Sequence, residues 1–263
     1  MKFRSLFFLL FLLMSFKTYS QHQKDRPLST ADDLAITRDS LALQVRNKLL
    51  CPVQIHVISR SDNKILQSMI IPPLDSVVVL KEIPEGYFET HRIAYYWGDP
   101  ATIKPDLNYP YRLPFKKGKK IEVSQSFNGK SSHQSISGKY AIDFVMPVGT
   151  KVYAAREGQV IKVIDWFTKH GGQAYVNKAN KIIILHKDGT MASYVHLDYQ
   201  GSVIQEGQWV EKGAVIGYSG FTGKTSGPHL HFVVRKDNDI AIPVYFEGYP
   251  NQILKAGKRY KAK

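Results

Sequence analysis

His229 and His231 are separated by a single leucine, and this spacing is the first sign of chemistry in the sequence. Successive side chains of a β-strand point to opposite faces, so both imidazoles would share one face while Leu230 and Phe232 occupy the other. Two histidines on one face are a natural half of a metal site. A polar strand face in contact with water would produce the same spacing, so the pair alone does not decide between the two.

Three further residues stand in settings that suit the same chemistry. Asp143 lies between Ile142 and Phe144, and an ionised carboxylate in apolar company is costly unless it is paired, hydrogen-bonded or bound to metal. A strand-edge aspartate facing solvent is the alternative. His133 lies in a loop before that strand, and His196 ends a strand-like run. Taken singly, each of these two histidines is also compatible with a surface or capping imidazole.

The elements that must position these residues are short strands. Helical periodicity is almost absent after Ile121, and turn signals such as Asp188-Gly189 and Lys212-Gly213 separate the apolar runs. The pattern predicts strands at residues 140–145, 150–155, 159–166, 181–186, 191–196, 214–218 and 230–235. We therefore expect an all-β chain in which the candidate residues lie on an antiparallel β-sheet domain with a groove active site.

Several of these segments, taken together, resemble a known family. Residues 126–235 are similar to the catalytic domain of the lysostaphin/LytM-type zinc metallopeptidases, a duplicated-hybrid-motif-like β fold. The matching stretches include Ser132-His133, Tyr140-Ala-Ile-Asp-Phe144, Gly149-Thr150, Tyr194-Val-His-Leu197 and Ser226-Gly-Pro-His-Leu-His-Phe232, in the family's order. The combination is far more specific than any single motif.

The resemblance implies a role for each candidate residue. The metal ligands would be His133, Asp143 and His231, the metal Zn²⁺, and the assisting histidines His196 and His229. The family's first motif spaces its histidine and aspartate by four residues, whereas here the spacing is ten (143 − 133). Two imidazoles and one carboxylate leave a fourth zinc position open for water, as in catalytic sites. The implied activity is that of an endopeptidase acting on peptidoglycan stem peptides or cross-bridges.

The rest of the chain divides by composition. Lys2 and Arg4 precede an apolar run over residues 6–16, which is typical of a secretory signal peptide. An uncleaved membrane anchor is the alternative, but the run is short for a span. We predict a signal peptide at 1–20, a flexible lead-in at 21–35, a small β-sandwich accessory domain at 36–97, a Pro/Tyr/Lys-rich linker or wall-forming loop at 98–120, a peptidase domain at 121–247 and a basic tail at 248–263, of which residues 255–263 form a solvated, frayed end.

Composition limits the partners. The 263 residues include 36 Lys+Arg and 22 Asp+Glu, a net charge of +14, which suits an anionic surface such as a cell wall. A secreted or periplasmic location makes nucleic acid an unexpected partner, and no stable membrane insertion is expected after signal cleavage. The single cysteine, Cys51, excludes an internal disulfide and a multi-cysteine zinc finger. It is expected to be a small buried hydrophobe.

Two other functions fit parts of the sequence. A catalytically inactive relative that binds wall or regulates an amidase would keep the fold and lose ligands, whereas all five functional positions are present here. A biotinyl- or lipoyl-like carrier is suggested by Glu206-Gly207 and Lys212-Gly213, but it would leave His229 and His231 unused.

Overall fold

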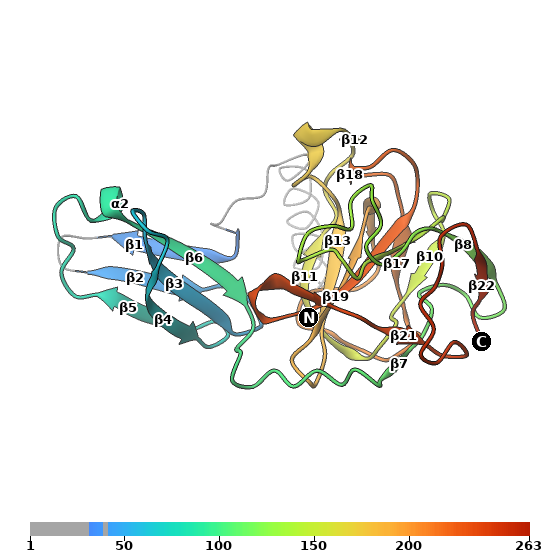
Figure 1. Ribbon diagram of the computed structural model, residues 1–263, viewed down its shortest axis with the longest axis horizontal. Coiled ribbons are helices and arrows are strands. Elements are labelled where there is room, and N and C mark those ends of the chain that lie inside the picture. Colours follow the sequence, from blue (N-terminus) through green and yellow to red (C-terminus); the bar gives the residue numbers. More distant parts are fainter. Residues whose placement is uncertain (1–31, 39–41) are drawn as a thin grey trace, which may run out of the picture.

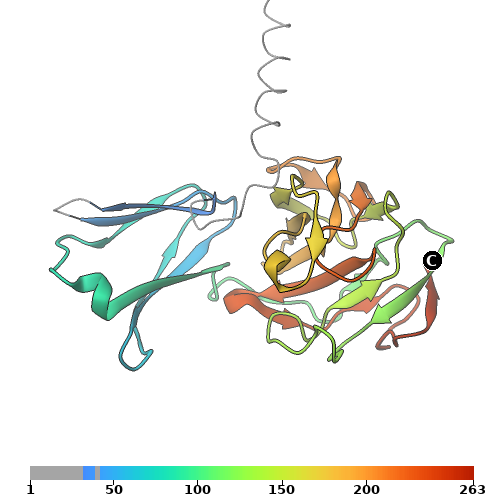
Figure 2. The ribbon, with the colours of Figure 1, turned by 90° about the horizontal axis from the view of Figure 1, so that it is seen from above.

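The computed structural model of this protein describes residues 32–38 and 42–263. The predicted signal peptide at 1–20 and most of the predicted lead-in lie outside the described residues. In the described ranges, no helix combines the length and apolar character that crossing a membrane requires. The chain forms two β lobes side by side, a small lobe (residues 32–97) and a large lobe (residues 104–263) (Figures 1 and 2).

The small lobe is a sandwich of two three-stranded antiparallel sheets, in the orders β1-β2-β5 and β4-β3-β6. Their inward side chains alternate with exposed ones; in β2, for example, Leu43, Val45 and Asn47 are buried and the residues between them are exposed. Its elements are β1 (Leu34–Arg38), β2 (Leu43–Asn47), β3 (Val53–Ser59), β4 (Ile65–Ile71), β5 (Ser76–Leu80), α2 (Tyr87–Thr90) and β6 (His91–Trp97).

The large lobe is built around a nine-stranded sheet, with a smaller sheet covering one face. The elements of the large lobe are β7 (Pro110–Tyr111), β8 (Lys120–Gln125), β9 (Ile142–Phe144), β10 (Lys151–Tyr153), β11 (Gly158–Ile164), β12 (His170–Gly171), η2 (Gln173–Tyr175), β13 (Lys181–Leu185), β14 (Met191–Val195), β15 (Leu197–Ser202), β16 (Trp209–Val210), β17 (Val215–Ser219), β18 (Gly223–Lys224), β19 (Leu230–Lys236), η3 (Asp237–Asp239), β20 (Ile240–Ile242), β21 (Tyr245–Phe246) and β22 (Arg259–Lys261).

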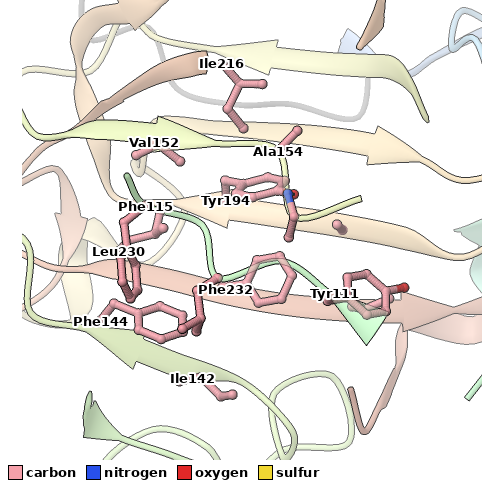
Figure 3. Close-up of a cluster of buried hydrophobic side chains, with 14 of the residues drawn as sticks. Tyr111, Phe115, Ile142, Phe144, Val152, Ala154, Tyr194, Ile216, Leu230 and Phe232 are labelled. Carbon is pink, nitrogen blue, oxygen red and sulfur yellow. The ribbon is translucent and has the colours of Figure 1, made fainter. Parts of the chain in front are cut away.

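The strand order of the large sheet is β16-β11-β13-β14-β19-β9-β8-β22, with β20 paired to β19, and the covering sheet runs β10-β17-β15. Between the two sheets lies the main core, to which Tyr194, Phe232, Phe144, Val152 and Ile216 contribute fully buried side chains (Figure 3). All pairs are antiparallel except the two-residue pairs β12–β18 and β21–β7. The all-β, antiparallel prediction is confirmed.

The alternation of β19 decides which side chains meet the core. Leu230, Phe232 and Val234 are completely buried between the sheets, so His231 and Arg235 point to the opposite face of the large sheet. That opposite face is the one that carries the candidate site.

Three predictions about the flanking segments are wrong. Leu34, placed in the flexible lead-in, is buried at the start of β1, which pairs with β2. The segment predicted as a linker at 98–120 contributes Tyr111, Leu113 and Phe115 to the main core, because these large apolar residues stand at alternate positions beside Pro110 and Pro114. The tail predicted to fray pairs with β8 as β22 and buries Tyr260.

The lobes are joined by an apolar contact and an ion pair. Ile161, Ile183 and Met191 lie on the open face of the large sheet and belong to the core of the small lobe. Beside them, the ammonium of Lys162 lies 3.0 Å from a carboxylate oxygen of Asp33. The small lobe therefore rests on the same face of the large sheet as the candidate site.

Candidate active site

Asp143 and His231 are brought together by strand register. β9 and β19 are neighbours in the large sheet, and Asp143 is the direct partner of His231 across the pair. Side chains of directly opposed residues lie on the same face of a sheet. As a result, Asp143 Oδ1 lies 2.9 Å from His231 Nδ1, although 88 positions separate the two residues in the chain.

His133 reaches the same carboxylate from a loop. Its backbone N–H donates to the carbonyl of Gly129, and its ring Nδ1 lies 2.9 Å from the carbonyl oxygen of Ser126. This leaves His133 Nε2 3.2 Å from Asp143 Oδ2. One ligand atom from each of His133, Asp143 and His231 lies within 4.8 Å of the others, so the three side chains form a group that can hold a metal ion.

The electrostatics of this contact call for a cation. A carbonyl oxygen only accepts hydrogen bonds, so His133 Nδ1 carries the ring proton and the neutral ring presents a lone pair at Nε2. That buried nitrogen has no hydrogen-bond partner and faces a carboxylate oxygen. Two acceptors 3.2 Å apart are stable only with a positive charge between or on them. The donor set of two imidazoles and one carboxylate fits Zn²⁺.

The pKa values of the pair agree with this reading. Burial alone would raise the pKa of Asp143, but the neighbouring imidazoles of His133 and His231 outweigh it, and the pKa falls far below its usual range. Burial likewise opposes protonation of His133, yet the neighbouring carboxylate produces a net rise in its pKa. The lowered pKa of Asp143 and the raised pKa of His133 both mean that the site stabilises a positive charge beside an ionised carboxylate.

His196 and His229 stand beside this group. Their ring centroids are 4.6 Å apart, and those of His196 and His231 are 6.0 Å apart. His196 Nδ1 donates to the carbonyl of Thr222 at 2.7 Å, and His229 Nδ1 donates to the carbonyl of Gly227 at 2.9 Å. In the neutral form, each ring therefore has its lone pair at Nε2, and His229 Nε2 lies 3.8 Å from Asp143 Oδ1.

His196 is held in an unusual conformation. It follows β14 with a φ of 65°, in the left-handed region that non-glycine residues seldom adopt. Burial, followed by the neighbouring imidazoles of His229 and His231, lowers the pKa of His196 to about 3. The ring is therefore neutral near neutral pH.

Sequence reasoning missed Gln125 at the end of β8. Its side-chain Nε2 donates to Asp143 Oδ2 at 2.9 Å and to Ser132 Oγ at 2.7 Å. Its Oε1 accepts from the backbone N–H groups of Ser131 and Ser132. Gln125 thus orients the carboxylate and ties it to the loop that carries His133. No motif marks this glutamine, because its role depends on the register of β8 against β9.

The group lies in a groove with a volume of about 1040 Å³. Its floor is formed by β13, β14 and β19, and its walls by the segments 171–179 and 224–228 and the loop at 131–132. An open groove of this kind accepts an extended chain.

The other histidines of the described residues lie apart from the group or have partners elsewhere. His56 contacts Ser68 Oγ, His91 stacks on Tyr87, and His186 contacts the carbonyl of Glu157. His170 stacks on the ring of Phe221.

Comparison with known proteins points to one family. Residues 137–243 match the model of peptidase family M23. The chain is 33% identical over 116 residues to the peptidoglycan DD-endopeptidase ShyA of Vibrio cholerae, covering 43% of this chain and 24% of that protein. It is 35% identical over 94 residues to lysostaphin of Staphylococcus simulans, covering 35% of this chain and 17% of that protein.

The matches cover a limited part of each partner. The chain spans about a quarter of the length of ShyA. Among solved structures, a zinc containing peptidase from Vibrio cholerae matches 76% of this chain and 54% of its own, with 23% identity and a TM-score of 0.39. The family segment begins at residue 137, after His133, so the position of His133 rests on the geometry described above.

Proposed function

The chain carries a peptidase family M23 domain, and from this we propose that it is a secreted or periplasmic zinc metalloendopeptidase that hydrolyses peptide bonds in peptidoglycan stem peptides or cross-bridges. The observation that carries the proposal is the convergence of His133, Asp143 and His231 within 4.8 Å, with a buried acceptor of His133 aimed at an ionised carboxylate. The relative ShyA is a peptidoglycan DD-endopeptidase, and this similarity supports the substrate class.

We assign the five residues as follows. His133 Nε2, the carboxylate of Asp143 and the ring of His231 would hold Zn²⁺. When bound, Zn²⁺ polarises a scissile carbonyl and lowers the pKa of water. The Nδ1 atoms of His196 and His229 donate to backbone carbonyls, so the neutral form of each ring has its lone pair at Nε2, and both residues line the groove. One of these rings takes the proton of the attacking water, and the imidazolium so formed is a donor for the developing oxyanion or the leaving amine.

The fixed Nδ1 contacts give the two rings their orientation. A neutral ring tied to a carbonyl accepts a proton at Nε2 and returns it there, so the proton moves at one atom of a rigid group. Thr225 Oγ1 lies 3.2 Å from His229 Nδ1 and adds a second contact on the same side of that ring. Peptide hydrolysis also requires a surface that binds the substrate. The groove provides an extended surface on which a peptide can lie across the five residues.

The test is digestion of defined peptidoglycan fragments by the zinc-loaded protein, with mass spectrometry of the products. The proposal expects peptide fragments that together exceed the substrate by one water, intact glycan, and no products after treatment with a chelator. Unchanged peptides after incubation with the zinc-loaded protein would contradict it. The inactive alternative predicts that outcome together with a rise in the rate of an added amidase; it finds no support in a site with all five residues assembled.

A further inference from the structure

The floor of the groove continues from the candidate metal centre to a lysine. Lys181 on β13 is the direct partner of Val195 on β14, and Val195 is in turn the direct partner of His231 on β19. All three side chains line the groove. Neighbouring strands are about 4.8 Å apart, so the Cα atom of Lys181 lies roughly 10 Å from that of His231.

A second cation lies beside this row. Arg235, four residues along β19 from His231, also lines the groove. Its guanidinium Nη1 donates to Ser193 Oγ at 3.2 Å, its Nε donates to the carbonyl of Ser137 at 2.7 Å, and Nε lies 3.2 Å from Asp239 Oδ1. Arg235 thus has a carboxylate partner at the groove edge.

Lys181 has none. No hydrogen bond or ion pair of its ammonium occurs within residues 32–38 and 42–263, although its side chain is half-buried. The nearby carboxylates are engaged elsewhere, since Asp33 pairs with Lys162 at 3.0 Å and Asp239 with Arg235. Counting these charges leaves one uncompensated positive charge on the groove floor, at Lys181.

A half-buried ammonium without a counter-ion is unfavourable. Burial, and after it the positive charge of Arg235, lowers the pKa of Lys181. A ligand that supplies a negative charge at this point therefore stabilises the ammonium of Lys181, and it gains a charge-assisted hydrogen bond at the same time.

We propose that Lys181, assisted by Arg235, is a specificity-determining residue that binds a carboxylate of the substrate peptide. An extended peptide advances about 3.3 Å per residue, so a span of roughly 10 Å places this carboxylate within about three residues of the bond over the metal centre. This inference rests on the proposed function and deepens it: the substrate class becomes peptides with a free carboxylate near the scissile bond.

The experiment uses the zinc-loaded full chain and pairs of synthetic wall peptides that differ only in one group, a carboxylate in one and a primary carboxamide in the other. The group is placed one, two, three or four residues from the scissile bond, on either side. Binding is measured by calorimetry and cleavage by mass spectrometry. The variants are Lys181→Met, Lys181→Arg and, as a matched control, Lys151→Met, an exposed lysine on β10 that does not line the groove.

At one position of the carboxylate, the wild type is expected to bind the acid about tenfold more tightly than the amide, or better, because hydrogen bonds to charged groups are worth this much. Lys181→Met should reduce this ratio of affinities, acid over amide, to within about twofold. Lys181→Arg and Lys151→Met should retain the wild-type ratio. A ratio near one in the wild type, or a ratio unchanged in Lys181→Met with zinc content and melting temperature intact, would overturn the proposal. Charge-dependent binding through Lys181 without cleavage would support it while refuting the proposed peptidase activity.

Discussion

Asp143 faces three imidazoles, and the differences among these contacts are the basis for the proposed division into metal ligands and assisting residues. His133 and His231 approach the carboxylate to 3.2 and 2.9 Å, whereas His229 stays 3.8 Å away and His196 makes no contact with it. Only the first two complete a group of atoms within 4.8 Å. This geometry supports the proposal that His133 and His231 hold the metal ion while His196 and His229 assist the reaction.

This division predicts opposite results from neighbouring substitutions. His231→Ala removes a ligand, so the protein should lose stoichiometric zinc. His229→Ala should retain zinc and lose turnover by about 10²–10⁴-fold, the usual contribution of a group that transfers a proton. Metal analysis of dialysed protein and rates on a wall peptide check both results, with His170→Ala as a histidine control outside the group. Retained zinc in the first variant, or full turnover in the second, would refute the assignment.

His186 predicts a loss of stability in mild acid. Burial lowers the pKa of His186 to about 4, below the value of roughly 6.5 in an unfolded chain. The unfolded state therefore binds the extra proton as pH falls from 6.5 toward 4, and the stability contributed by the neutral ring, at most about 3 kcal/mol, is lost in that window. Urea unfolding gives the free energy of unfolding at pH 7 and at pH 5. The decrease between the two pH values should be about 2 kcal/mol smaller in His186→Asn than in the wild type. Equal declines would contradict this.

At the scale of elements, the segment before β13 holds the site together through one side chain. Asn180 is completely buried; its Oδ1 accepts from the backbone N–H of Phe167, and its Nδ2 donates to the carbonyls of Phe167 and Asp198. Its backbone N–H donates to Thr222 Oγ1, and Thr222 is the residue whose carbonyl orients His196.

Asn180→Ala should therefore destabilise the fold by about 3 kcal/mol, because buried backbone groups lose their partners. It should also reduce turnover through His196 while zinc is retained, because the side chain no longer holds the carbonyl of Asp198, two residues after His196. Urea unfolding, metal analysis and peptide cleavage measure the three effects, with Asn108→Ala as an exposed control. A change in the free energy of unfolding below about 0.5 kcal/mol would show that the hydrogen bonds of Asn180 are replaced.

The strands that carry the site were predictable because each has a strong local pattern. The predictions at 181–186, 191–196 and 230–235 correspond to β13, β14 and β19 within one residue at each end, since each is a short, largely apolar run, and Asp188-Gly189 marks the turn between the first two. β15 was not predicted, because Leu197–Ser202 is largely polar and pairs irregularly with β17. The role of Gln125 could not be predicted from the sequence either. It depends on the pairing of β8 with β9, and no residue close to Gln125 in the sequence indicates it.

For the whole molecule, the segment between the lobes fixes where the chain can be shortened. Tyr111, Leu113 and Phe115 belong to the main core of the large lobe, and loss of one such side chain costs about 3–5 kcal/mol. A chain lacking residues 21–115 should not fold, because the total stability of a domain is only about 5–15 kcal/mol.

A chain lacking residues 21–103 should fold and bind zinc, with reduced stability because Ile161, Ile183 and Met191 lose their cover. Circular dichroism, thermal unfolding and metal analysis compare the two truncations. Equal folding of both chains would mean that residues 110–115 contribute little to the core. Failure of both would mean that the large lobe depends on the small lobe to fold.

The central claim is that His133, Asp143 and His231 bind one zinc ion and leave a position open. X-ray absorption spectroscopy of the zinc-loaded chain at one equivalent tests it most directly. We expect two imidazole nitrogens near 2.0–2.1 Å, oxygen ligands from a carboxylate and solvent, and no sulfur. A shell containing sulfur, a third imidazole that closes the site, or failure to retain one equivalent of zinc would contradict the account.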